Sequence, residues 1–531
     1  MDRAAQLARL RETAPFDLAV IGGGATGLGV ALDAAARGFR VALVEAVDFA
    51  KGTSSRATKL VHGGVRYLAQ GNVGLVREAL HERALLLANA PHLAQPIAFV
   101  MPSYRWWERG FYGAGLKMYD ALAGRRGLGD TQFLSAAQTL ALLPTLQREG
   151  LTGGVKYWDG QFDDARLAVA LARTAVSQGA CVVNHCAAIG LVREGGKLRA
   201  LVAEDRESGE TFTIRAHCVI NAAGVWVDAI RGMDAELGAA RRAALVAPSQ
   251  GVHLVVDREF LPTDHALLIP KTRDGRVLFA VPWMGKTILG TTDTPSEALA
   301  LEPTPFASEV EFILSEAARC LSNAPTRADV RSVWVGLRPL VKPSEDDEAD
   351  DTKTISREHT VAVGRSGLVT VTGGKWTTYR AMAEDVLDRC FAAALLEARP
   401  GSATAYLPLA GAPKRSAESL AQPPGEHLYG TDADTLHGLP GADRWLWRDG
   451  GGGLSEAMVR FAVRHEMART VEDVLARRSR LLFLDAAQAA AVADDVASLL
   501  REELGAGFDA VASASSFKAL AAHYLELPVG S

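Results

Sequence analysis

The sequence lacks several features that would assign it to other classes of protein. No stretch approaches the roughly 18 uninterrupted apolar residues of a membrane-spanning helix, so any membrane contact is expected to be peripheral. The N-terminal segment MDRAAQLARLRETAP lacks the apolar core of a signal peptide, so no export is expected. The 57 basic and 62 acidic side chains are mixed along the chain, and the formal net charge is −5. The protein therefore has no global positive field that would attract nucleic acid, and no nucleic-acid partner is expected.

Cysteine is also scarce. The five cysteines are scattered, odd in number and never spaced as CxxC, which fits free thiols in a reducing cytosol. The acidic run within residues 345–351 is expected to be a solvated loop rather than a metal site, and no metal is expected. The cysteines, expected to be small buried residues, are Cys181, Cys186, Cys218, Cys320 and Cys390.

What is present is a long chain with a large apolar content. Its 531 residues are 48% hydrophobic, which predicts two to four structural units. FDLAVI at 16–21 predicts a strand, TGLGVALDAAAR at 26–37 a helix, and FRVALVE at 39–45 a second strand. These three segments form one βαβ unit.

Two later apolar segments, CVIN at 218–221 and LVTVT at 368–372, each end in a glycine turn and are expected to join the same sheet. Alternating residues at 251–257, 276–283 and 287–293 predict antiparallel strands. The fold class is therefore α/β, a discontinuous Rossmann-like domain with an antiparallel-sheet substrate domain. The expected nucleotide-binding segments are 16–90, 150–245 and 355–398, and the substrate segments are 91–149 and 246–354.

A proline-rich and glycine-rich linker begins near residue 399. Apolar residues at helical spacing follow it, as in 456–484, and predict a separate helical domain over 405–531. This part of the sequence contains no recognisable catalytic constellation.

The motif Gly22-x-Gly24-x-x-Gly27 lies between the first strand and the helix. Glycines there permit a tight turn and close approach of a pyrophosphate to the helix N-terminus. Glu45 ends the second strand 18 residues beyond Gly27, where a carboxylate can bind ribose hydroxyls and disfavours NADP. The unit is expected to hold the ADP half of a dinucleotide.

Two further segments favour FAD over NAD. KGTSSRATKLVHGGVRY at 51–67 is long enough to wrap the flavin end, and GGKWTTYR at 373–380 places a helix N-terminus and Lys375 by the flavin pyrimidine. The residues expected at the cofactor are Gly22, Gly24, Ala25, Thr26, Gly27, Glu45, Thr53, Ser54, Ser55, His62, Gly63, Gly64, Ala223, Gly224, Gly373, Gly374, Lys375, Trp376 and Thr377.

At these residues the chain resembles the FAD-dependent, respiratory and quinone-linked glycerol-3-phosphate dehydrogenases, within the D-amino-acid-oxidase-like flavoproteins. The resemblance spans about residues 16–380 and rests most specifically on KLVHGGVRYL, GLRPL and GGKWTTYR. It also implies that the C-terminal helices are that family's cap. The implied reaction is oxidation of sn-glycerol 3-phosphate to dihydroxyacetone phosphate, with FAD as hydride acceptor.

Such a reaction requires a base for the hydroxyl proton and cations for the phosphate. Arg66, Tyr67 and Arg338 are expected to bind the phosphate and polar end, and Lys375 to reach the substrate from the flavin side. His253 is the expected base, with Arg338 as a rival that would stabilise the developing alkoxide. His62 is expected to touch the flavin.

The resemblance further implies electron transfer to ubiquinone or menaquinone at the inner face of the cytoplasmic membrane. Residues 104–126 combine a net charge of +3 with aromatic residues that include Trp106, Trp107, Phe111, Tyr112 and Tyr119, which suits a membrane interface. Packing on the protein's own domain explains the pattern equally well. The alternatives are an oxidase of glycerol 3-phosphate or an amino acid that uses oxygen, and a non-catalytic nucleotide-binding regulator. The oligomeric state stays open, with a homodimer as one alternative.

Overall fold

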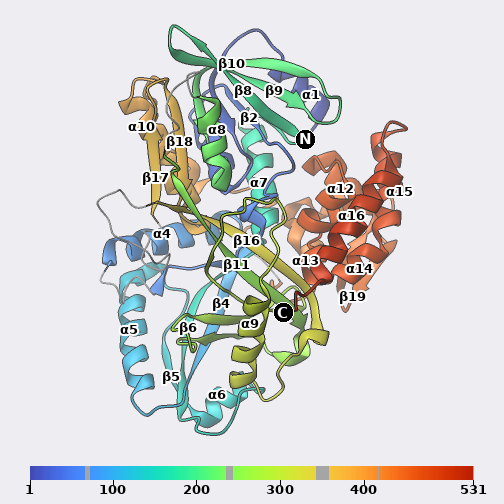
Figure 1. Ribbon diagram of the computed structural model, residues 1–531. Helices are drawn as coiled ribbons and strands as arrows, with labels where there is room; N and C mark the ends of the chain where they lie inside the picture. The colour runs from blue at the N-terminus through green and yellow to red at the C-terminus, as the bar shows by residue number, and fades with distance from the viewer. Residues whose placement is uncertain (66–71, 235–242, 343–357, 416–417, 530–531) are drawn as a thin grey trace.

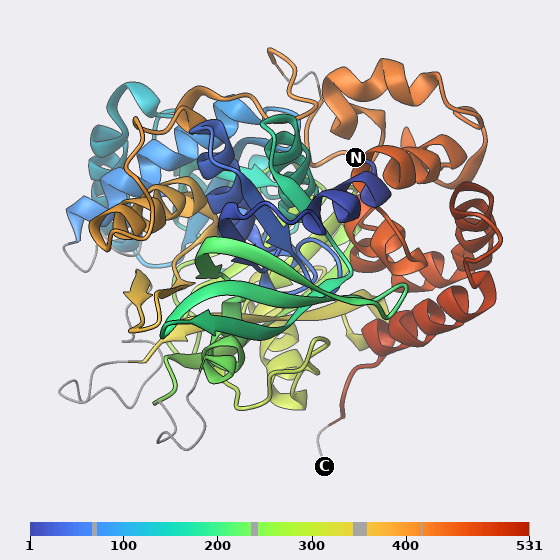
Figure 2. The same ribbon diagram turned by 90° about the horizontal axis from the view of Figure 1, so that it is seen from above.

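The computed structural model describes residues 1–65, 72–234, 243–342, 358–415 and 418–529. Figures 1 and 2 show three parts: a sheet that contains the N-terminal strand, a second sheet that lies below it in Figure 1, and a group of helices formed by the C-terminal part of the chain. These parts confirm the expected α/β fold class with a C-terminal helical domain. The acidic run at 345–351 lies outside the described residues.

The first sheet is built on β1 (Phe16–Ile21), which pairs in parallel with β2 (Val41–Val44) and β10 (Thr211–Asn221). β10 also pairs in parallel with β18 (Leu368–Gly373), so the later strands expected in this sheet are confirmed. α2 (Ala25–Ala36) connects β1 to β2. The other strands of this sheet are β7 (Cys181–Val183), β8 (Cys186–Glu194), β9 (Lys197–Asp205) and β17 (His359–Val363).

Both faces of β1 are buried, as its nearly continuous apolar sequence predicts. Leu18 and Val20 face the cluster that contains α2, α7 (Asp164–Ser177) and α10 (Tyr379–Ala392). Ala19 and Ile21 pack in the other direction, in a cluster with α1 (Arg3–Leu10) and strands β8 and β9. The alternation of period two therefore gives the sheet two cores.

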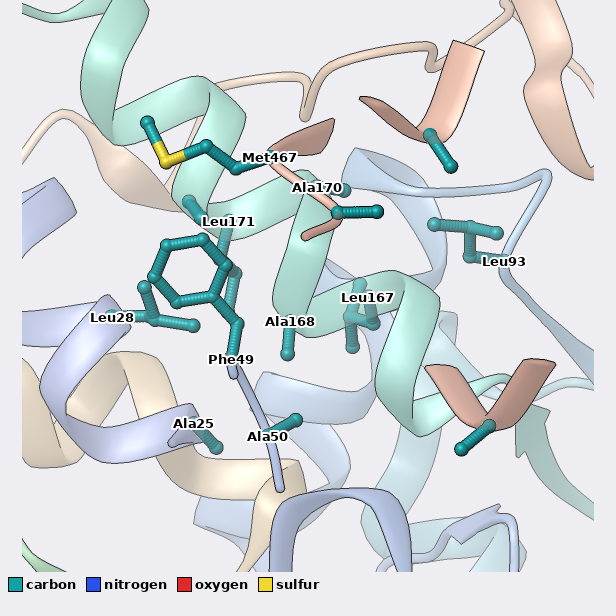
Figure 3. Close-up of a cluster of buried hydrophobic side chains, with 14 of the residues drawn as sticks. Ala25, Leu28, Phe49, Ala50, Leu93, Leu167, Ala168, Ala170, Leu171 and Met467 are labelled. Carbon is teal, nitrogen blue, oxygen red and sulfur yellow. The ribbon is translucent and has the colours of Figure 1, made fainter. Parts of the chain in front are cut away.

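The first of these cores extends to the C-terminal helices. In Figure 3, Phe49 lies beside Leu28 of α2 and Leu171 of α7, and Met467 reaches the same cluster from the C-terminal part of the chain. The segment after β2 is thereby packed against three elements that are far apart in sequence.

The second sheet is mostly antiparallel, with β12 and β4 as a parallel pair. Its long strand β11 (Val246–Asp257) pairs with β14 (Lys286–Gly290) and β16 (Val330–Val341). The strands expected at 251–257, 276–283 and 287–293 are confirmed as antiparallel strands and belong to β11, β13 and β14, although β14 ends at Gly290. The other strands are β3 (Leu60–Val61), β4 (Ala94–Ser103), β5 (Gln132–Ser135), β6 (Gly153–Phe162), β12 (Ala266–Ile269), β13 (Leu278–Trp283) and β15 (Thr294–Pro295).

Strands β3 and β6 lie within segments that we expected to belong to the nucleotide-binding domain, yet they pair in the second sheet. The two domains interleave more finely than the proposed boundaries indicate. Four helices cover the outer parts of this region or connect its strands, and α8 lies beside the first sheet. The four helices are α4 (Val73–Asn89), α5 (Glu108–Ala123), α6 (Ala136–Leu142) and α9 (Ala307–Cys320), and α8 spans Val227–Met233.

The C-terminal unit packs against α7 and against β16 of the second sheet. Among the helices in the described part of the chain, none has both the length and the apolar character needed to cross a bilayer. The unit consists of α11 (Ala433–His437), β19 (Trp445–Asp449), β20 (Gly452–Ser455), α12 (Glu456–Glu466), α13 (Leu481–Leu484), α14 (Ala486–Ala491), α15 (Ala493–Leu504) and α16 (Ala510–Leu525).

Buried ion pairs join this unit to residues 48–59, which we call the loop 48–59. Asp48 is fully buried and pairs with both Arg477 and Arg478. The Nζ atom of Lys51 lies 2.6 Å from Glu472 Oε1. Removing one partner of a buried ion pair typically costs about 3–5 kcal/mol, because the other charge is left without a counter-ion. Ion pairs with the C-terminal unit therefore hold the loop 48–59 in place.

Candidate active site

The glycine turn has the geometry that the sequence predicts. β1 ends at Ile21, and α2 begins at Ala25 with Gly24 as its N-cap. Gly22 has a φ of +113°, a region that favours glycine. A Cβ on Gly27 would lie 2.0 Å from the Gly22 carbonyl oxygen, so only glycine lets the helix approach the turn this closely. The cradle fits a dinucleotide pyrophosphate at the helix N-terminus.

Glu45 lies just after β2, next to this turn. Its Oε2 accepts a hydrogen bond from the Gly23 amide at 2.6 Å, and its Oε1 accepts one from the Val47 amide at 2.9 Å. Burial raises the pKa of the Glu45 carboxyl above its usual value, while these two amides oppose the shift. The carboxylate therefore lies at the carboxyl end of β2, beside the glycine turn.

Gly27→Ala is expected to give a protein that loses bound flavin and is destabilised by about 1–3 kcal/mol, because the added methyl overlaps the turn. Flavin absorbance after gel filtration and thermal unfolding measure the two effects. Gly232→Ala is the matched control, since a Cβ on this glycine of α8 would have nothing within 4 Å. If Gly27→Ala kept its flavin and unfolded at the wild-type temperature, the glycine turn would not be the dinucleotide cradle.

Two segments expected at the flavin end meet although they are far apart in sequence. The indole Nε1 of Trp376 donates to the Ser54 carbonyl at 2.9 Å, across 322 positions of sequence. Ser54 Oγ accepts from the Ala25 amide at the start of α2, also at 2.9 Å. Gly373 and Gly374, with φ of +79° and +74°, turn the chain from β18 into this contact. The fold therefore joins the glycine turn, the loop 48–59 and residues 373–377.

The other expected cofactor residues lie around this junction. The Thr53 hydroxyl donates to the Leu337 carbonyl at 2.6 Å, and the Thr377 hydroxyl contacts the His62 carbonyl at 3.5 Å. Gly63 donates its amide to the Tyr119 hydroxyl at 2.9 Å. Thr26 lies in the first turn of α2, Ser55 ends a short 3₁₀ turn, Gly64 has positive φ, and Ala223 and Gly224 follow β10.

A cavity of about 270 Å³ lies beside this junction, between the two sheets. It brings together His62, His253, Arg338 and Lys375, four of the side chains that the sequence singles out. Arg66 and Tyr67, expected to bind phosphate, lie outside the described residues. Backbone and side-chain atoms of residues 373–377 form one wall, and β11 and β16 form another.

His253 lies on β11, on the opposite face from Val252 and Leu254, as alternation predicts. Its Nε2 is 2.9 Å from the Thr58 hydroxyl oxygen, and its ring stacks on Trp334 with centroids 4.1 Å apart. Burial lowers the pKa of His253 well below its usual range, and the positive charges of Lys59 and Arg338 lower it further. The imidazole is therefore neutral at physiological pH, the form that a proton acceptor needs.

Arg338 lies on β16 opposite Ser249. Its guanidinium donates to the carbonyls of Gln250 and Thr292 at 3.2 and 3.0 Å, and Nη1 lies 3.2 Å from Asp293 Oδ1. A Cβ on Gly251 would lie 2.3 Å from Nη2, so this glycine makes room for the guanidinium. These contacts fix a cation at the cavity wall beside His253.

Sequence reasoning missed three residues around His253. Thr58 contacts the imidazole directly, Trp334 supports its ring, and Lys59 lies behind Trp334. Trp334 faces His253 because β11 and β16 pair at this register, and local sequence gives no sign of that pairing. Lys59 and Thr58 were within the expected flavin loop, but their residue types alone gave no reason to choose them.

The site thus combines a neutral histidine, a fixed guanidinium and a lysine around one cavity, next to a dinucleotide cradle. Such an arrangement can remove a proton from a hydroxyl group, stabilise negative charge and bind an anion. It suits oxidation of an anionic alcohol by a flavin.

Comparisons with known proteins agree with this chemistry. Residues 17–380 match the family model described as FAD dependent oxidoreductase, and residues 373–509 match the C-terminal domain of alpha-glycerophosphate oxidase. The mitochondrial glycerol-3-phosphate dehydrogenase of Homo sapiens is 41% identical, over 94% of this chain and 72% of that protein. The mitochondrial protein of the same name from Arabidopsis thaliana is also 41% identical, over 92% and 83%.

Solved structures give the same result for the whole fold. The glycerol-3-phosphate dehydrogenase from Bacillus halodurans, complexed with FAD, is 29% identical, with a TM-score of 0.77 over 100% of this chain and 99% of that one. An L-alpha-glycerophosphate oxidase from Mycoplasma pneumoniae, 16% identical with a TM-score of 0.57 over 73% of this chain and 97% of that one, shares the fold.

Proposed function

The chain belongs to the family of FAD-dependent glycerol-3-phosphate dehydrogenases, and on this premise we propose that it oxidises sn-glycerol 3-phosphate to dihydroxyacetone phosphate and passes the electrons to a membrane quinone. The observation that carries the proposal is that His253, Arg338 and the segment 373–377 line the same cavity. The glycine turn, the loop 48–59 and residues 373–377 would hold FAD, which would supply the acceptor for the hydride from C2 of the substrate.

Residues of this chain supply the proton acceptor, the stabilising charge and the binding of the anionic end of the substrate. His253 takes the proton of the C2 hydroxyl, because burial and two nearby cations keep its imidazole neutral. Arg338 stabilises the negative charge that develops on this oxygen, held in place by Asp293 and two carbonyls. Lys375 binds the anionic end of the substrate from the flavin side, together with Arg66 and Tyr67.

The proposal is tested by adding glycerol 3-phosphate to the purified flavoprotein without oxygen. We expect the flavin absorbance to bleach with glycerol 3-phosphate and to remain unchanged with glycerol or amino acids, since those lack the phosphate that the cationic wall binds. A protein that stays yellow with glycerol 3-phosphate would refute the reaction. Hydrogen peroxide formed in air in equal amount to the oxidised substrate would favour an oxygen-using oxidase instead of quinone transfer.

A membrane contact for quinone transfer is proposed at α5. Gly113, Leu116, Tyr119 and Ala123 of this helix are buried against the protein, which accounts for part of the pattern in residues 104–126. The opposite side is exposed at Phe111 and Met118, with Arg109 and Lys117, and Trp106, just before the helix, is 88% exposed. Exposed aromatic and basic side chains on one helix suit an anionic lipid surface. We propose that the protein docks peripherally on the inner face of the cytoplasmic membrane.

The double variant Trp106→Ser, Phe111→Ser is expected to bind anionic phosphatidylglycerol vesicles at least about tenfold more weakly, since each aromatic side chain contributes about 1.5–3 kcal/mol when buried. Vesicle co-sedimentation of the flavin-loaded protein measures this. Tyr406→Ser is the matched control, because Tyr406 is 83% exposed but lies on a different element. Equal vesicle binding by the double variant would exclude α5 as the docking element.

A further inference from the structure

Behind the cavity, the loop 48–59 and the C-terminal unit share a fully buried charge cluster. Lys59 Nζ donates to the Ser55 carbonyl at 2.8 Å and to Asp164 Oδ2 at 2.7 Å. Arg480 Nη2 donates to the same Ser55 carbonyl at 2.9 Å and to Asp164 Oδ1 at 3.0 Å. Lys59, Asp164 and Arg480 have no solvent exposure. Two cations from distant parts of the chain therefore hold one carboxylate and one backbone carbonyl.

The cluster reaches His253 along two routes. The Lys59 ammonium lies 4.5 Å from the centroid of Trp334, and the imidazole of His253 stacks on the same indole. Thr58, the residue before Lys59, places its hydroxyl 2.9 Å from His253 Nε2. A cation held against an aromatic ring is attracted by its π face, and in a dry site this attraction reaches about 2 kcal/mol or more. Lys59 thus lies against the ring that stacks on the imidazole and next in the chain to the hydroxyl that contacts Nε2.

We propose that Lys59 is a positioning residue for His253: it fixes the imidazole between Trp334 and Thr58 and disfavours its protonated form, while Arg480 of the C-terminal unit holds the counter-ion of Lys59. This inference rests on the proposed role of His253 as the base. It gives the C-terminal unit a part in the reaction without any contact with substrate. The cluster is nearly neutral as a whole, because Asp163 and Asp164 balance Lys59 and Arg480.

The electrostatic effect has a definite sign. The charged groups that face His253 are Lys59 and Arg338, and both disfavour a second positive charge. Arg56, His62 and Lys375 line the same cavity farther along its wall. Burial lowers the pKa of Lys59 itself to about 7, so Lys59 carries its charge in the acidic range where an imidazole takes up a proton. Removing Lys59 must therefore make His253 easier to protonate.

Lys59→Met tests this inference, since Asp164 keeps Arg480 and the Ala57 amide as partners. The rate of anaerobic flavin reduction by glycerol 3-phosphate is measured against pH with flavin-loaded protein. The acidic fall in this rate is expected to move upward by about one pH unit. The substrate concentration at half-maximal rate should stay within about twofold, because Lys59 lies outside the cavity wall. Lys59→Gln, which keeps a donor for the Ser55 carbonyl, is expected to shift the profile in the same direction.

Lys51→Met is the matched control. Lys51 is another buried lysine of the loop 48–59, paired with Glu302 and Glu472, and its ammonium does not stack on Trp334. Its pH profile should keep the wild-type position. Nitrogen NMR of the histidine rings, with His253 assigned by His253→Asn, follows the same shift without substrate.

The outcomes separate the two proposals. A wild-type flavin that glycerol 3-phosphate does not bleach would overturn the proposed function. Bleaching with an unmoved acid limb and an unmoved His253 titration in the Lys59 variants would overturn the positioning role alone. An equal shift in Lys51→Met would also overturn it, because the effect would then belong to the loop in general.

Discussion

Arg338→Ala is expected to lower the rate of anaerobic flavin reduction by glycerol 3-phosphate by about 10²–10³-fold while FAD stays bound. The guanidinium lies at the cavity wall beside His253 and is fixed by the carbonyls of Gln250 and Thr292 and by Asp293. A donor fixed in advance stabilises developing negative charge without reorganisation, which is why its loss affects the rate more than cofactor binding. Stopped-flow measurement of the flavin absorbance gives the rate constant.

Arg331→Ala is the matched control for this effect. Arg331 lies on the same strand, but its guanidinium is exposed and pairs with Asp257 away from the cavity. Its removal should leave the rate near that of the wild type, since exposed ion pairs contribute only about 0–1 kcal/mol. Arg338→Lys should recover only part of the rate, because an ammonium lacks the planar fork. Normal bleaching by Arg338→Ala would remove Arg338 from the reaction.

His253→Asn should slow flavin reduction by about 10²–10⁴-fold, the usual contribution of a positioned general base. In the wild type the imidazole is neutral at physiological pH, because burial and the charges of Lys59 and Arg338 keep its pKa well below its usual range. The rate should therefore fall only in acid, where the base becomes protonated. In His253→Asn this acid limb should disappear, since the titrating group is gone.

His265→Gln provides a comparison with a histidine of the same domain that does not line the cavity. Both its rate and its pH profile should match the wild type. If His253→Asn reduced its flavin at the normal rate with the acid limb intact, the base would have to be another group. Arg338 would then keep only the role of stabilising the developing alkoxide, because a guanidinium stays protonated and cannot accept the proton itself.

Much of the fold follows from local sequence. β1 occupies the predicted residues 16–21, and α2 begins one residue before the predicted segment, because an apolar run, a glycine turn and an alanine-rich helix each favour one conformation. The segments at 218–221 and 368–372 were also assigned to the correct sheet, since their glycine endings resemble that of β1. Parallel strands buried on both faces give this signal from residue types alone.

The surroundings of His253 could not be predicted in the same way. Trp334 contacts the imidazole because β11 pairs with β16. Lys59 is held against Trp334 by its ion pair with Asp164, at the start of α7. Such contacts depend on register between strands about 80 residues apart in sequence and on helix packing, neither of which leaves a local pattern. The pairing of β3 and β6 in the second sheet, which interleaves the two domains, could not be predicted for the same reason.

The pairing of Asp48 with Arg478 also has a consequence for the order of events during synthesis. The two residues are 430 positions apart, so β1, α2 and β2 leave the ribosome long before the counter-charge of Asp48 exists. Until then the loop 48–59 carries a carboxylate that cannot be buried without a large cost in free energy. The chain can therefore bury Asp48 at low cost, and so fix the loop beside the glycine turn, only after residues 477 and 478 have been synthesised.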